Sequence, residues 1–102
     1  MKNIRVIYTV QEAYVEQNKA NIAQVMKDLR ALNNPNTKYA SYLEEDGLTF
    51  MHFAQYPDEE TSQLLNSLPS FAKFRKELKE SRPTSPPKAI SLSLVGSAFD
   101  IF

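Results

Sequence analysis

The chain has 102 residues, of which 42% are hydrophobic and 24% charged, and these values are ordinary for a globular protein and argue against disorder of the whole chain. Its twelve basic and twelve acidic residues balance, which disfavours nucleic-acid binding because phosphate contacts favour a basic excess. The sequence also lacks cysteine, and it has neither an apolar run near the roughly 20 residues that span a bilayer nor an apolar signal segment. We therefore expect one cytoplasmic domain over residues 1–102, without membrane partners.

The N-terminal third predicts a strand followed by a long helix. Residues 4–10 are β-branched and aromatic, which favours a strand with Tyr8 on one face and Arg5 on the other. From residue 12 to residue 32 apolar side chains recur every three or four positions, as in an amphipathic helix with one buried face. These side chains are Val15, Ile22, Val25, Met26, Leu29 and Leu32. An asparagine-rich turn around Pro35 ends the helix.

The middle of the chain predicts a β-hairpin. Residues 38–45 and 48–56 flank an Asp46-Gly47 pair, which favours a two-residue type I′ turn with positive φ at both positions. Counting outward from this turn places Leu43 opposite Phe50 and Ser41 opposite His52. Both faces of the hairpin are largely apolar, so we expect both faces to be covered.

The C-terminal part predicts further helix and a last strand. A helical region follows Asp58, and Pro69 is expected to begin a second segment of it, because proline suits the first helical position. Phe71, Phe74 and Leu78 would form its buried stripe. Residues 81–87 are interpreted as an extended linker and residues 88–95 as the last strand, followed by an apolar tail that ends in Phe99, Ile101 and Phe102.

This order of elements predicts a ferredoxin-like βαββαβ sandwich of the α+β class, in which two helices cover one face of a four-stranded antiparallel sheet. The uncovered face of the hairpin would then expose Tyr42, Met51 and Phe53. Monomers seldom expose an apolar patch of that kind. We therefore predict a homodimer in which the two sheets pack face to face around a two-fold axis.

Segments spread over nearly the whole chain resemble the dimeric α/β-barrel superfamily that includes the antibiotic-biosynthesis-monooxygenase-like proteins. They are YTV at 8–10, EQN at 16–18, KYASY at 38–42, DGLTFMHF at 46–53, LPSFAKF at 68–74 and VGS at 95–97. The resemblance implies a dimeric α/β barrel and a pocket between sheet and helices. Superfamily members include oxygenases, isomerases and haem-handling enzymes, so it implies no single activity. Cofactor-independent oxygenases of this superfamily activate a phenol-like substrate in such a pocket.

His52 and Asn18 are the first candidates for chemistry. His52 is the only histidine, the side chain that ordinarily titrates near neutrality, and on its strand it could act as a catalytic acid or base. Alternatively, it is a structural histidine that bonds to Ser41 or a backbone carbonyl. Asn18 interrupts the apolar stripe of the first helix, so its amide is expected to bind a ligand, a strand carbonyl or the other subunit.

Tyr8, Tyr39, Tyr42 and Arg75 are candidates for ligand binding. The three tyrosines bring hydroxyl groups to the sheet, although aromatic residues in strands often serve only as core. Arg75 is flanked by Phe74 and Leu78 near the apolar stripe of the later helix, where it either faces an anionic ligand or extends along its methylenes to water. Haem-degrading members place a histidine at the position of Arg75 and use a tryptophan that this chain lacks, which disfavours that reaction.

Two classes of function stay open. One is a cofactor-free enzyme, monooxygenase-like, that acts on a small apolar or aromatic molecule, because no motif calls for a nucleotide or metal. The other is a non-catalytic module that binds such a ligand or a protein partner. An RNA-recognition domain shares the same order of elements, but Asp46 and Leu48 stand where its third strand needs a basic and an aromatic residue.

Overall fold

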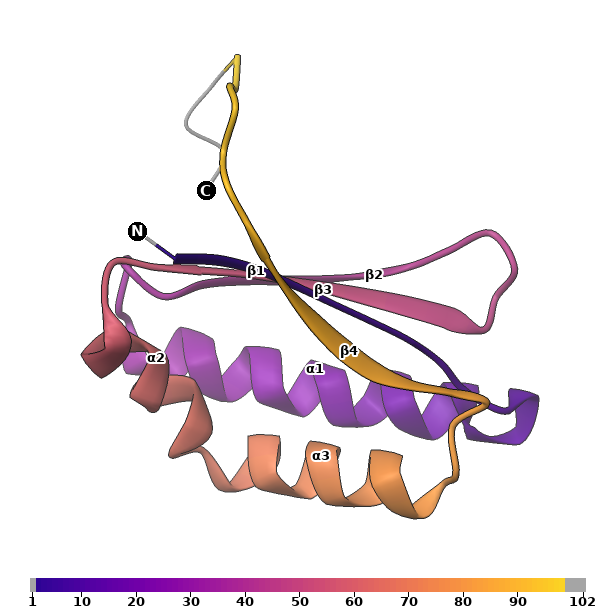
Figure 1. The fold of residues 1–102 in the computed structure, drawn as a ribbon. Helices are drawn as coiled ribbons and strands as arrows, with labels where there is room; N and C mark the ends of the chain where they lie inside the picture. The colour runs from indigo at the N-terminus through magenta and orange to yellow at the C-terminus, as the bar shows by residue number, and fades with distance from the viewer. Residues whose placement is uncertain (1, 99–102) are drawn as a thin grey trace.

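A four-stranded antiparallel sheet with helices on one face forms the described part of the protein, residues 2–98 (Figure 1). The computed structural model has the elements β1 (Lys2–Thr9), η1 (Glu12–Tyr14), α1 (Val15–Leu32), β2 (Lys38–Leu43), β3 (Thr49–Tyr56), α2 (Glu59–Asn66), α3 (Pro69–Glu80) and β4 (Ser85–Leu92). The strand order is β2-β3-β1-β4. This confirms the predicted ferredoxin-like sandwich, with α2 and α3 together in the position of the second helix.

The helix boundaries follow from local chemistry. Asn33 ends α1 in the left-handed conformation, with φ of 52°. The Asp58 carboxylate accepts the backbone N–H of Thr61 at 2.8 Å and caps the start of α2. Pro69 begins α3, as predicted, because its missing N–H is not needed in the first turn. No helix within residues 2–98 is long and apolar enough to cross a membrane.

The register of the β2–β3 hairpin is as predicted, but the prediction of a two-residue type I′ turn is wrong. Leu43 pairs with Phe50 and Ser41 with His52. The Glu44 N–H donates to the Thr49 carbonyl at 2.8 Å, so residues 45–48 form a longer loop. Only Gly47 has positive φ there, at 72°. The Asp46 carboxylate instead accepts the N–H groups of Leu48 and Thr49, which closes the loop without a second left-handed residue.

Strand β4 covers Ser85–Leu92, whereas the predicted strand covers residues 88–95, so both ends lie three residues earlier than predicted. Ile7 pairs with Lys88 and Thr9 with Ser85, so Pro86 and Pro87 together stand opposite one residue of β1 in a bulge. Prolines lack the N–H of a ladder, and β4 tolerates them because it is an edge strand. The segment interpreted as a linker therefore contributes the start of the strand. The predicted apolar tail at Phe99, Ile101 and Phe102 lies outside the described residues.

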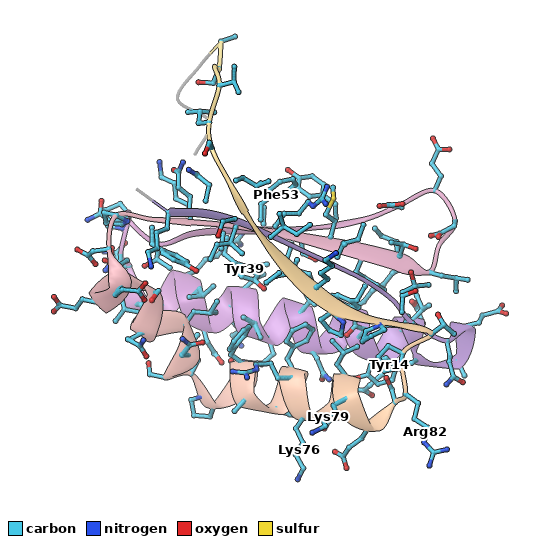
Figure 2. The ribbon with its side chains drawn as sticks, in the orientation of Figure 1. Tyr14, Tyr39, Phe53, Lys76, Lys79 and Arg82 are labelled. Atoms are coloured by element: carbon cyan, nitrogen blue, oxygen red, sulfur yellow. The ribbon has the colours of Figure 1, made fainter. Side chains whose placement is uncertain are left out.

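Alternating side chains divide the sheet into a helix-covered face and an outward face. The buried core between sheet and helices comprises Tyr8, Val10, Val25, Phe50, Leu65, Phe74 and Leu78. The outward face carries Arg5, Ile7, Tyr42, Met51, Phe53 and Ile90, which the strand register brings side by side. Phe53 marks this side of the sheet in Figure 2. No helix in residues 2–98 covers it (Figure 1).

We expect Gly47→Ala to lower the free energy of unfolding by about 1 kcal/mol, because a Cβ is disfavoured at positive φ. A Cβ there would meet no atom within 4 Å, so the cost is conformational. Gly96→Ala is the matched control, since Gly96 has equally open space and no left-handed φ. Urea denaturation of both variants checks this, and equal stabilities would contradict the loop geometry.

Candidate active site

A cavity of about 510 Å³ lies between the sheet and α3. Its lining residues are Val6, Tyr8, Tyr39, His52, Phe71, Phe74, Arg75, Leu78, Lys79, Pro83, Pro86 and Pro87. The three prolines come from the end of the α3–β4 connection and from the bulge of β4, so the broken ladder at Tyr8 also shapes the cavity wall. Its size and mostly apolar lining suit a small aromatic molecule.

A buried chain of hydrogen bonds borders this cavity. His52 Nε2 lies 2.7 Å from the Tyr8 hydroxyl, and His52 Nδ1 lies 2.8 Å from the Tyr39 hydroxyl. Asn18 on α1 donates from Nδ2 to the Tyr8 oxygen at 2.9 Å. The chain therefore joins one helix to three strands. Figure 2 shows Tyr39 in the layer between the sheet and the helices.

The hydrogen-bonded side chains of His52, Tyr8 and Tyr39 carry one more proton than their two hydrogen bonds use. A neutral imidazole carries one N–H, and each phenol carries one O–H, so three protons serve the two contacts of His52. If His52 is protonated on Nδ1, it donates to Tyr39, and the Tyr39 proton is spare. If it is protonated on Nε2, it donates to Tyr8, and the Tyr8 proton is spare. Tyr8 and Tyr39 both line the cavity, so in either tautomer the spare O–H belongs to a residue of the cavity wall.

Burial keeps the hydrogen-bonded side chains of His52, Tyr8 and Tyr39 uncharged at neutral pH. His52 is only 3% exposed, and its desolvation lowers the pKa of the imidazole to about 4. Burial also raises the pKa values of the Tyr8 and Tyr39 phenols well above the usual range. The ring planes of Tyr8 and His52 stack with centroids 5.3 Å apart, and Phe74 closes on His52 at 5.5 Å. These aromatic neighbours exclude water from the imidazole.

The structure brings five of the six candidate residues to one place. Tyr8, Tyr39, His52 and Arg75 line the cavity, and Asn18, which is fully buried, contacts it through Tyr8. The structure removes Tyr42 from the site, because it lies 55% exposed with its ring against Phe53, on the outward face. Tyr42 lies three residues after Tyr39 in β2. Because side chains alternate along a strand, this odd spacing places the two tyrosines on opposite faces of the sheet.

Two features of the site were not predicted from the sequence. The partners of His52 are tyrosines of β1 and β2, not Ser41 or a backbone carbonyl. Lys79 lines the cavity one turn after Arg75, a spacing of four residues that was visible in the sequence. Within residues 2–98, no three His, Cys, Asp or Glu side chains gather in a group that could hold a metal ion.

The fold and the site together define a ferredoxin-like α+β domain with an aromatic cavity under the sheet. Solved structures with this fold include a putative antibiotic biosynthesis monooxygenase from Bacteroides thetaiotaomicron, with a TM-score of 0.81 and 12% identity, covering 99% of this chain and 95% of that one. Another from Nitrosomonas europaea has a TM-score of 0.77 and 12% identity, covering 94% and 100% of the two chains.

A third structure is a mutant of SnoaB, a cofactor-independent oxygenase from Streptomyces nogalater. It has a TM-score of 0.70 and 13% identity to this chain, and the match covers 95% of each. No protein-family model and no curated protein matches the sequence. The similarity to antibiotic-biosynthesis-monooxygenase-like proteins is therefore confirmed as a shared fold.

We expect stability to fall as the pH drops from about 6.5 to about 4, the interval between the unfolded and folded pKa values of His52. In this interval the unfolded chain binds a proton that the folded chain excludes, so acid favours unfolding. The contribution of this one group is about 3 kcal/mol in total. Urea denaturation between pH 7 and pH 4 measures it.

His52→Gln is the control for that measurement, because glutamine does not titrate while the carboxylates of the protein stay the same. The stability of the wild type should fall more steeply with acid than that of the variant. Parallel curves for the two proteins would contradict a buried neutral imidazole.

Proposed function

We propose that this protein is a cofactor-free oxygenase that acts on a small aromatic molecule carrying a hydroxyl or enol group. The observation that carries the proposal is the pair of phenols bonded to the two nitrogens of the buried imidazole beside a mostly apolar cavity, from which one spare phenol proton follows. The fold shared with SnoaB, a cofactor-independent oxygenase, supports the same reaction class by analogy.

The chain of side chains suits the first step of such a reaction, which is ionisation of the substrate. The spare phenol donates a hydrogen bond to the substrate oxygen, where negative charge develops. The other phenol accepts the substrate proton while it passes its own proton to His52. The low pKa of the His52 imidazole opposes this transfer, but a substrate anion beside the imidazole would raise that pKa again.

Oxygen chemistry then follows from the substrate anion itself. With anthrone as the probe, the anion gives one electron to O₂, and the resulting radical pair forms a carbon–oxygen bond. The peroxide takes up the proton held by His52 and loses water to give anthraquinone. One oxygen atom of O₂ becomes the new carbonyl oxygen, and the other leaves as water. The apolar walls formed by Phe71, Phe74 and Leu78 keep bulk water from the anion.

We expect Tyr39→Phe and Tyr8→Phe each to slow anthrone oxidation by roughly 10²-fold, because each removes a link of the proton path or the donor to the substrate oxygen. Tyr42→Phe is the matched control, since it deletes the same hydroxyl on the outward face and should not change the rate. Oxygen consumption and ¹⁸O₂ incorporation into anthraquinone measure turnover. Equal rates in all three variants would sink the assigned site.

Binding without turnover is the second candidate function, and one observation favours it. Both ring nitrogens of His52 are already engaged by phenols, so the imidazole reaches a ligand only through them. A protein of this class would bind the aromatic probe in the cavity and leave it unoxidised. Tyr39→Phe would then weaken binding of the probe, and no oxygen would be consumed by the wild type.

We further propose that the protein works as a homodimer joined through the outward faces of its sheets. This face carries Ile7, Met51 and Ile90 without a covering helix. The same face is the one on which the ring of Tyr42, 55% exposed, packs edge-on against Phe53. Leu94 and Val95 are exposed in the segment that leaves the sheet after β4 (Figure 1).

We expect Met51→Glu to convert the dimer to a monomer, because it places a charge at the centre of the apolar outward face. The substituted side chain faces away from the core, so the far-ultraviolet circular dichroism spectrum should not change. Ala23→Glu, on the exposed side of α1, is the control. Native mass spectrometry reads the subunit number, and a wild-type monomer would overturn the dimer.

A further inference from the structure

The cavity carries positive charge that nothing in the described chain neutralises. Of its lining residues, Arg75 and Lys79 are cationic and none is Asp or Glu. Neither cation forms a salt bridge within residues 2–98, where the ion pairs involve other lysines. Both residues are exposed on α3, and most of the other residues that line the cavity are apolar.

The spacing of the two cations adds to this imbalance. Arg75 and Lys79 are four residues apart on α3, so they share one face of the helix, where like charges destabilise it slightly. The Arg75 guanidinium carbon lies 5.7 Å from the centroid of the Phe71 ring. That contact holds the charge over an aromatic residue of the cavity wall. An anion between Arg75 and Lys79 would relieve the repulsion.

The two chemistries of the cavity have different origins in the fold. The phenol donors come from the sheet through Tyr8 and Tyr39, whereas the cations come from α3. A ligand that satisfies both needs an oxygen for the phenol and a separate negative group for the cations. Its rings would lie against Phe71 and Phe74 between them.

We propose that the ligand of this cavity is an aromatic carboxylate, held at its acid group by Arg75 and Lys79. This inference rests on the proposed aromatic-binding function and adds the charge of the ligand. The arginine offers a planar pair of donors that matches a carboxylate, and the lysine offers a second charge. Without that negative group, the ligand would leave both cations unpaired.

The test compares 6-hydroxy-2-naphthoate with methyl 6-hydroxy-2-naphthoate, which has the same hydroxylated ring system without the charge, by isothermal titration calorimetry at neutral pH and low ionic strength. The wild type should bind the carboxylate at least ten-fold more tightly than the ester. Arg75→Gln and Lys79→Gln should each weaken binding of the carboxylate by about five-fold and leave binding of the ester unchanged. Added salt should weaken binding of the carboxylate and leave binding of the ester unchanged.

Lys76→Gln is the matched control, because Lys76 lies on the same helix and does not line the cavity. It removes one positive charge from α3 and should not change either affinity. Equal binding of carboxylate and ester, unaffected by Arg75→Gln and Lys79→Gln, would overturn the inference while the aromatic cavity stands. Binding of neither probe would overturn both the inference and the proposed aromatic ligand.

Discussion

The arrangement of this domain depends on a polar chain enclosed in an apolar layer. Asn18, Tyr8, His52 and Tyr39 are joined by hydrogen bonds of 2.7 to 2.9 Å, while the side-chain oxygen Oδ1 of Asn18 has no partner within residues 2–98. A buried polar group without such a partner costs more free energy than the bond itself contributes, so these residues fix the positions of α1, β1, β2 and β3 relative to one another. The same requirement makes the imidazole neutral, and it leaves one phenol proton unused.

The rest of the fold places a cavity beside that unused proton. The prolines of β4 interrupt the ladder opposite Tyr8, and the stripe of α3 supplies Phe71 and Phe74 as an apolar wall. Two exposed cations on α3, Arg75 and Lys79, complete the lining of the cavity. Stability and chemistry are therefore coupled here, because the residues that hold the sheet to the helices are also those that meet a ligand.

The order of elements could be predicted because its signals are local. The helical period of α1, the proline at the start of α3 and the Asp-Gly pair each act within a few residues, and the hairpin register follows by counting from the turn. The turn type could not be predicted, because it depends on which backbone groups the Asp46 carboxylate binds. The partners of His52 were missed because Tyr8 and Tyr39 reach it only when the strands are side by side.

The most direct test of this account is nitrogen-15 NMR of the imidazole of His52 at pH 6, which is unambiguous because the chain has one histidine. At that pH an exposed imidazole is mostly protonated. We expect a neutral ring with one protonated nitrogen and a slowly exchanging N–H proton, because burial lowers the pKa of the imidazole to about 4. An imidazolium signal that titrates with a midpoint near 6.5 would contradict the buried chain and the proton path built on it.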